Sequence, residues 1–244
     1  MRVYKYLLQI LLISFLISCG GGSSNIEADR NPLPSEPTTE TLFGKAVFIG
    51  TISNPDYDRD AQYPTWDDTD NDCISNRHEI LIARHINDDV SYPLVLTESG
   101  CRVVSGKWLD SYNNEYYYSA SDIQIDHLVA LYEAHISGAG NFTISEQRLF
   151  ANTGDKLEGT LPETSHEFMA VSGSSNQSKG SKQPGNVADD GWMPENEDFH
   201  CIYLLKWVEI KFLNGLYFDR EEFDFIKGYE NQCSEVTLPD LTPN

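Results

Sequence analysis

Four widely spaced cysteines limit the folds open to this chain, namely Cys73, Cys101, Cys201 and Cys233. The fifth cysteine, Cys19, belongs to the N-terminal segment described below, and in a chain whose N-terminus indicates export the even number that remains predicts disulfides. Three pairings are possible, and we favour Cys73–Cys101 with Cys201–Cys233, because each then closes a loop of about 30 residues and adds about 3 kcal/mol of stability. The alternative, a zinc site built from all four, lacks the closely spaced cysteine pairs typical of such sites.

The N-terminal residues predict that the protein is exported. Export would place it in an oxidising compartment, where disulfides persist. Basic side chains precede an apolar run over residues 6–17, which is too short for a permanent membrane span. The run ends in Leu16-Ile17-Ser18-Cys19, which resembles the cleavage site of bacterial lipoproteins, where the cysteine sulfur is acylated. We therefore expect a signal peptide at residues 1–18 and a lipid on Cys19 that anchors the protein to the bacterial envelope, at the outer membrane or cell surface. The alternative is an ordinary secretory signal that contains a cysteine by chance.

Composition divides the rest of the chain into a tether and one domain. Residues 19–45 are rich in Gly, Ser, Pro, Thr and Glu, and their few apolar side chains predict a disordered tether. The remaining stretch of about 200 residues is long enough for one domain with a sizeable core, and no second linker divides it. We place this domain at residues 46–240.

Hydrophobic periodicity predicts a mixed α+β domain. Asp122–His127 alternates apolar and polar residues, as a half-buried strand does, and further strands are expected around residues 101–104 and 106–112. Helical spacing of apolar residues predicts helices at 76–92, 128–136, 146–152, 203–213 and 219–229, the last capped by Asp219.

The chain is strongly acidic, with 17 Lys and Arg against 38 Asp and Glu and a formal net charge of −21. Removal of the signal peptide takes away Arg2 and Lys5 and makes the chain more acidic still. Broad, non-specific binding of nucleic acid needs many cations facing phosphates, so this charge argues against it. An enzyme acting on nucleic acid would need a local site with a metal ion, or enough salt to screen its own charge.

Asp126 and His127 stand together at the end of a predicted strand, which places a hard oxygen ligand beside an imidazole. Asn176 follows much later, in a serine-rich segment that also holds Lys179 and Lys182. An amide oxygen suits a hard divalent cation, and the lysines suit phosphate. Both lysines are therefore predicted to contact substrate.

These residues belong to a series of blocks in which the chain resembles the HNH endonucleases, specifically the GmrSD C-terminal type. The resemblance covers residues 57–233. One block alone would be weak evidence, whereas their order and spacing together are specific. The blocks lie at residues 57–59, 66–73, 77–82, 101–108, 126–127, 148–152, 176–179, 192–194, 201–203 and 207–211.

The resemblance implies a ββα-metal (HNH, or His-Me finger) core at about residues 101–182, with additional helices around it. It makes His127 the general base and Asp126 and Asn176 the ligands of one Mg²⁺ or Mn²⁺ ion. The implied activity is metal-dependent hydrolysis of phosphodiester bonds in DNA, with RNA as an alternative substrate. No protein partner is implied, and the lipid is the expected membrane contact.

Three positions depart from the family pattern. Lys156 stands where many relatives have an asparagine that orients the catalytic imidazole, so the partner of His127 stays open. Ala130 replaces the usual proline and Ser181 the usual aspartate, and neither change removes a ligand. Arg148, from another block, is predicted to contact substrate, with pairing to a nearby carboxylate as the alternative.

A second acidic motif has the ligand spacing of a calcium loop. Asp68, Asp70, Asp72 and Glu79 occupy positions 1, 3, 5 and 12 of an EF-hand loop, and a predicted helix follows. The glycine expected at position six is Cys73, and an acidic cap on the helix is the alternative. Two rival functions therefore stay open: a non-catalytic nucleic-acid-binding lipoprotein, and a calcium-stabilised surface lipoprotein.

Overall fold

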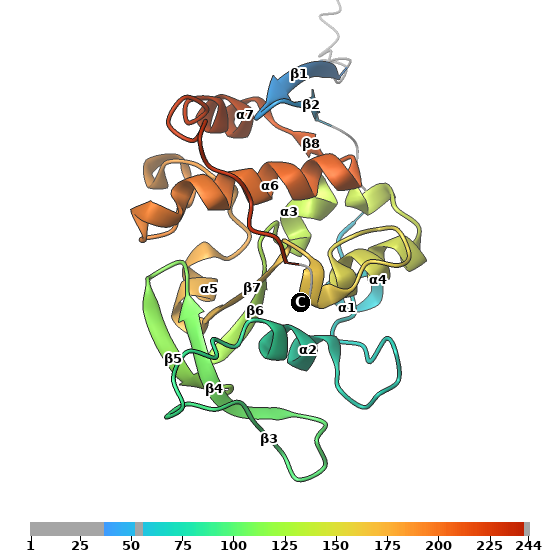
Figure 1. Ribbon diagram of the computed structural model, residues 1–244. Coiled ribbons are helices and arrows are strands. Elements are labelled where there is room, and N and C mark those ends of the chain that lie inside the picture. The colour runs from blue at the N-terminus through green and yellow to red at the C-terminus, as the bar shows by residue number, and fades with distance from the viewer. Residues whose placement is uncertain (1–36, 52–55, 242–244) are drawn as a thin grey trace, which may run out of the picture. The chain divides into compact units, whose positions relative to one another are not determined.

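The computed structural model describes residues 37–51 and 56–241 (Figure 1). They belong to one folded unit, Pro34–Asn244, which is a mixed α+β domain. The predicted signal peptide, the lipidated Cys19 and most of the predicted tether lie outside the described residues. In the described part of the chain, no helix combines the length and the apolar character needed to cross a membrane.

Strands and helices alternate irregularly along the domain. Strands β1–β8 span Thr38–Leu42, Lys45–Ile49, Val95–Leu96, Val103–Asp110, Glu115–Ser119, Ile123–His127, Phe168–Ser172 and Tyr217–Phe218. Helices α1–α7 span Arg59–Gln62, Asn76–Ala83, Leu131–Ile136, Ile144–Thr153, Gly173–Lys179, His200–Asn214 and Arg220–Lys227. Four short 3₁₀ helices, η1–η4, span Ala139–Asn141, Pro162–Thr164, Val187–Asp189 and Glu197–Phe199.

The described strands form three small sheets. The first has the order β1-β2-β8, with β8 parallel to β2, and the second is the antiparallel sheet β3-β4-β5. The third is the antiparallel pair β6-β7. In Figure 1, helix α6 runs between the first sheet and the β6-β7 pair.

The β6-β7 pair is buried on both faces and joins the two hydrophobic cores of the domain. Every residue of β7 is buried, and successive side chains of a strand point to opposite faces. Phe168 and Ala170 belong with Ile125 to one core, while Met169 and Val171 belong to the other, which also holds buried residues of α3 and α6. Two-sided burial holds these strands, and the residues at the end of β6, in a fixed position.

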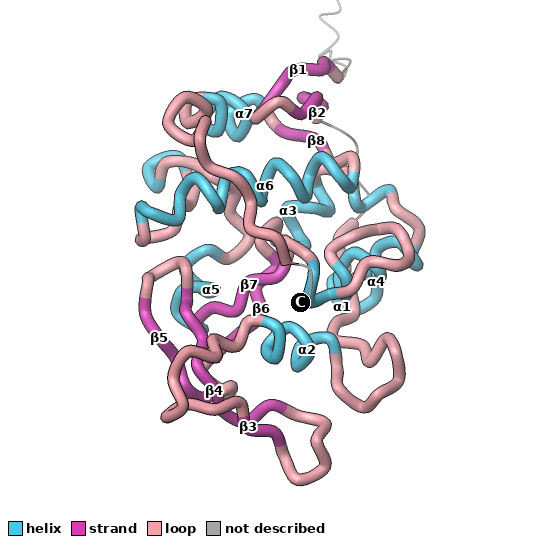
Figure 2. The backbone as a smooth tube through the Cα atoms, viewed as in Figure 1, coloured by secondary structure: helices cyan, strands magenta, loops and turns pink. Residues whose placement is uncertain are grey.

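Helix α5 follows β7 directly, so two antiparallel strands and a helix come in ββα order. The strands are not joined by a tight turn, because residues 128–167 between them contain α3, η1, α4 and η2 (Figure 2). The side chain of Ser172 caps α5 by accepting a hydrogen bond from the amide of Ser175, 3.1 Å away. The Ser175 hydroxyl in turn donates to the buried carboxylate of Asp110 over 2.6 Å, which ties α5 to β4.

Both predicted disulfides are confirmed. Cys73–Cys101 joins the loop before α2 to the segment before β4, with Cα atoms 5.2 Å apart. Cys201–Cys233 joins α6 to the segment after α7, with Cα atoms 5.3 Å apart. The bonded cysteines are 28 and 32 residues apart in the sequence, so each bond restrains the unfolded chain over a long loop.

Three predicted boundaries are wrong. The predicted tether at residues 19–45 ends earlier than expected, because Thr38–Leu42 pairs with β2 as strand β1. Helix α2 ends at Ala83, short of the predicted residue 92, and the side chain of Asp89 accepts a hydrogen bond from the amide of Ser91 in the loop that follows. Helix α3 begins at Leu131, because the amides of Leu128 and Val129 donate to Glu167 instead.

Loss of either disulfide should lower stability. We expect the paired substitution Cys201→Ser and Cys233→Ser to lower the free energy of unfolding by about 3 kcal/mol, measured by urea denaturation, because the bond closes a loop with a sequence separation of 32. The equivalent pair Cys73→Ser and Cys101→Ser, with a separation of 28, should have a similar effect. Unfolding curves that do not move under strong reductant would contradict this assignment.

Candidate active site

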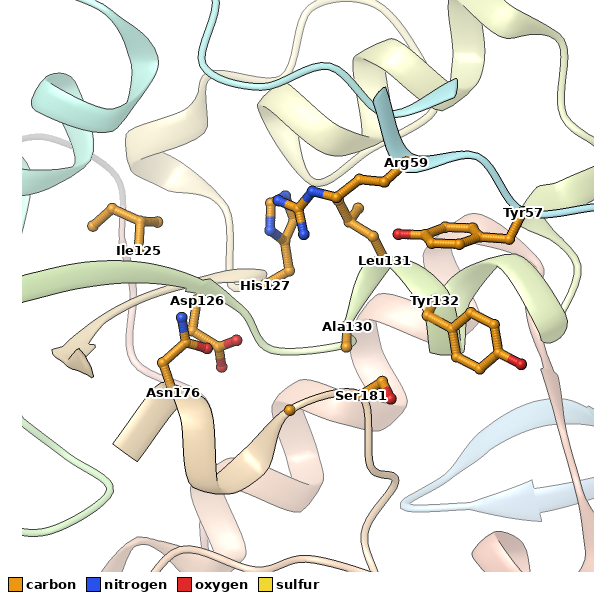
Figure 3. Close-up of a pocket in the computed structure, with 11 residues that line it drawn as sticks. Tyr57, Arg59, Ile125, Asp126, His127, Ala130, Leu131, Tyr132, Asn176 and Ser181 are labelled. Atoms are coloured by element: carbon orange, nitrogen blue, oxygen red, sulfur yellow. The ribbon is translucent and has the colours of Figure 1, made fainter. Parts of the chain in front are cut away.

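A cavity of about 300 Å³ lies where β6 ends and α5 passes beside it (Figure 3). It brings together Asp126, His127 and Asn176, which the sequence had singled out from two distant segments. Residues from α1 and α3 complete the wall. The full lining consists of Tyr57, Arg59, Ile125, Asp126, His127, Ala130, Leu131, Tyr132, Asn176, Gly180 and Ser181.

His127 is held at the inner end of this cavity, with only 6% of its surface exposed. Its ring stacks on Trp66, with centroids 5.3 Å apart, and meets the edge of Phe168 at 5.2 Å. Its Nε2 lies 2.9 Å from the backbone carbonyl oxygen of Ala151 in α4. Because a carbonyl can only accept, Nε2 carries the proton and Nδ1 of the neutral ring has the free lone pair.

The surroundings of His127 keep its imidazole neutral. Its pKa is lowered to about 3, mainly by burial; the hydrogen bond to Ala151 opposes this shift, and the charges of Arg59 and Lys179 add to it. His127 is therefore available as a proton acceptor across the physiological pH range.

The residue that orients His127 is Ala151, not the residue at the family's usual position. Lys156 instead bonds Asn214, through its backbone amide at 2.9 Å and through Nζ to the Asn214 carbonyl at 2.8 Å. A backbone carbonyl is present in every residue, so no sequence pattern could have identified Ala151 for this role.

Asp126 lies on the opposite face of β6 from His127, in a buried hydrogen-bonded group. Its Oδ1 accepts from Nζ of Lys179 at 2.9 Å, and its Oδ2 accepts from the hydroxyl of Tyr112 at 2.8 Å. Burial raises the pKa of Asp126, while Lys179 and Tyr112 act in the opposite direction. Burial and the charge of Asp126 raise the pKa of Tyr112, so its hydroxyl remains a donor.

Asn176 reaches the cavity from α5. Its side-chain amide donates to the Oε1 of Gln124 over 2.8 Å, an alignment that turns the amide oxygen away from Gln124. Gln124 and Asp126 share one face of β6, so Asn176 and Asp126 meet at the same side of the cavity. A carboxylate and an amide oxygen are the hard donor types that a Mg²⁺- or Mn²⁺-type ion takes, and at Asp126 such an ion would share the carboxylate with Lys179 and Tyr112.

None of the three basic residues predicted to contact substrate lines the cavity. Lys179 is fully buried. Its ammonium donates to the carboxylate of Asp126 and, over 2.8 Å, to the backbone carbonyl of His127. Arg148 lines a different cavity and holds the Asp67 carboxylate through two bonds, of 2.7 and 3.0 Å, which was the alternative left open. Lys182 is half-buried just beyond α5 and does not line the cavity.

Sequence reasoning missed three cavity residues: Arg59, Tyr57 and Tyr132. Arg59 is exposed, and its guanidinium is directed toward the ring of His127 in Figure 3. The first of the resembling blocks, Tyr57-Asp-Arg59, contained the signal, but spacing along the chain did not show that it folds against β6.

The predicted calcium loop brings three of its four carboxylates together. Oxygens of Asp68, Asp70 and Asp72 lie within 4.8 Å of one another, and all three residues are exposed. Cys73, at the position where an EF-hand has glycine, has a φ of 78°, in the left-handed region that glycine favours. Glu79 is not part of this group among the described residues, and calcium binding stays a prediction.

Comparison with known proteins gives one distant relative. The chain is 26% identical, over 201 residues, to an uncharacterized secreted protein of the fungus Arthroderma benhamiae (strain ATCC MYA-4681 / CBS 112371). The similarity covers 82% of this chain and 87% of the relative. No family model and no solved structure matches the chain.

Replacement of Lys179 tests whether this lysine is structural. We expect Lys179→Met to lower the free energy of unfolding by about 3 kcal/mol, because it leaves the Asp126 carboxylate buried without its cation. Lys182→Met is the matched control, since that side chain is only half-buried, and should change stability by less than about 0.5 kcal/mol. Equal stability of both variants, in urea denaturation, would show that Lys179 is not held in the core.

Proposed function

We propose that the protein is an exported, metal-dependent nuclease of the HNH type, which hydrolyses phosphodiester bonds in DNA, with RNA as an alternative substrate. The observation that carries the proposal is the convergence of Asp126, His127 and Asn176 on one cavity, with His127 neutral and oriented by Ala151. The ββα order of β6, β7 and α5, with cavity residues on β6 and α5, adds support.

In the proposed reaction, a phosphodiester enters the cavity beside His127. Nδ1 of His127 takes a proton from a water molecule, whose oxygen attacks phosphorus while the bond to the 3′ oxygen breaks and that oxygen gains a proton from solvent. Asp126 and Asn176 would hold the Mg²⁺ or Mn²⁺ ion, which supplies neutralisation of phosphate charge and stabilises the leaving oxygen.

The low pKa of His127 is compatible with this role. A base with a pKa of about 3 is weak at neutral pH, since general bases work best with a pKa near the operating pH. A phosphate anion in the cavity is a nearby opposite charge, which favours the imidazolium and raises the pKa of His127 when substrate is bound. A bound phosphate therefore acts against the effect of burial on this pKa, whereas the proposed metal ion acts with it.

Several observations support export. Two disulfides are typical of oxidising compartments, the N-terminus has a signal-like apolar run, and the fungal relative is named as secreted. Attachment through a lipid on Cys19 is the finer proposal and depends on the N-terminal pattern alone, because a fungal relative provides no support for a bacterial anchor.

Loss of the base should abolish cleavage. We expect the purified protein to nick plasmid DNA with Mg²⁺ or Mn²⁺ but not with EDTA, and His127→Ala to lower the rate by about 10²- to 10⁴-fold. Circular dichroism of both proteins provides the folding control. A folded protein that cuts neither DNA nor RNA with any divalent metal would favour the rival functions. If calcium also raised its melting temperature, the calcium-stabilised surface protein would be favoured.

The metal assignment has a separate test. Asn176→Ala should raise the Mg²⁺ concentration needed for half-maximal cleavage by about tenfold or more, because it removes one of the two proposed ligands. Asn113→Ala is the control. Asn113 lines a different cavity, so its loss should leave the Mg²⁺ requirement unchanged. Asn176→Ala protein with an unaltered Mg²⁺ requirement would refute the assignment.

A further inference from the structure

We infer that the cavity accepts an unpaired strand of nucleic acid, with Arg59 contacting a phosphate and Tyr132 stacking against a base. This inference rests on the proposed function and narrows its substrate class. It assigns a substrate role to two side chains that line the cavity beside the proposed base and metal ligands.

Arg59 is the basic side chain of the cavity wall. It is exposed and takes part in none of the ion pairs between described residues. Its backbone is fixed, because the Asp58 side chain caps α1 by accepting from the amides of Asp60 and Ala61. A guanidinium with free donors beside the proposed base matches the oxygens of a phosphate.

Tyr132 provides an aromatic surface next to this charge. Its side chain is 46% exposed, and its ring meets Tyr57 edge to face, with centroids 5.3 Å apart and an interplanar angle of 82°. Tyr57 in turn meets the buried ring of His135 at 5.1 Å. Tyr132 is therefore supported from behind by packed rings, and Figure 3 shows it with Tyr57 to one side of His127 and Arg59.

The depth of the cavity favours an unpaired strand over a duplex. His127 is only 6% exposed, so the scissile phosphate must enter a recess, whereas a rigid duplex keeps its bases stacked inside and away from Tyr132. A single strand can turn a base onto an aromatic ring while its backbone bends inward.

The charge of the chain points to the same substrate class. Duplex binding commonly uses many phosphate contacts, but this chain has a formal net charge of −21 and one basic side chain lining the cavity. Stacking is insensitive to charge, so a site that combines one arginine with one aromatic ring can hold a short unpaired segment in an acidic protein.

The test compares cleavage of a short single-stranded oligothymidylate with a hairpin duplex of equal length. We expect at least a tenfold higher kcat/KM for the single strand, and at least a tenfold loss of this advantage in Tyr132→Ala. Tyr132→Phe keeps the ring and should keep the preference. Tyr116→Ala is the matched control, because Tyr116 is 47% exposed on β5 and lies outside the cavity.

Arg59→Ala should lower kcat/KM for the single strand about a hundredfold, whereas Arg148→Ala, outside the cavity, should not. Binding is measured separately, by fluorescence anisotropy of the labelled oligothymidylate. The His127→Ala protein, which does not cleave the probe, is compared with double variants that also carry Tyr132→Ala or Arg59→Ala. Weaker binding in both double variants is the expected result.

The two proposals fail in different ways. Cleavage that needs His127 but is equally fast on the duplex, and is unchanged in Tyr132→Ala, would overturn the substrate inference and leave the nuclease intact. No cleavage of either substrate, with binding of the single strand still lost in the Arg59 and Tyr132 variants, would overturn the nuclease and support the strand-binding site.

Discussion

The buried ion pair between Asp126 and Lys179 connects the two parts of the candidate site. Asp126 belongs to β6 and Lys179 to the last turn of α5, and the same ammonium bonds the His127 carbonyl. Neither charge is stable in the core without the other, because an unpaired buried ion carries a large desolvation penalty. The pair therefore sets the position of α5 against β6, and with it the position of Asn176 beside Asp126.

The surrounding structure makes this arrangement rigid. The β6-β7 pair is packed on both faces, so Asp126 and His127 face opposite sides of the same strand yet reach one cavity at its end. Trp66 and Phe168 enclose the imidazole, and α4 supplies the carbonyl that orients it. Groups from four segments far apart in the sequence thus meet around one imidazole.

Local sequence signals predicted the strands and helices that neighbouring residues along the chain determine. Alternation identified β6, helical spacing identified α6 and α7, and Asp219 caps α7 as expected through a 2.7 Å bond to the amide of Glu222. Two predicted boundaries were wrong where the backbone hydrogen-bonds to a segment distant in the sequence. Residues 38–42 look like tether but pair with β2, and Leu128 and Val129 look helical but bond Glu167.

The sequence by itself determined the kinds of chemistry available: an Asp-His pair, a late asparagine, four cysteines free to form disulfides and a strongly acidic composition. Only the tertiary structure decided how these groups are used. It buried Lys179 against Asp126, paired Arg148 with Asp67, gave His127 the carbonyl of Ala151 and brought Arg59 to the cavity. The physical reason is that burial and charge pairing depend on neighbours that are distant along the chain. No local pattern encodes them.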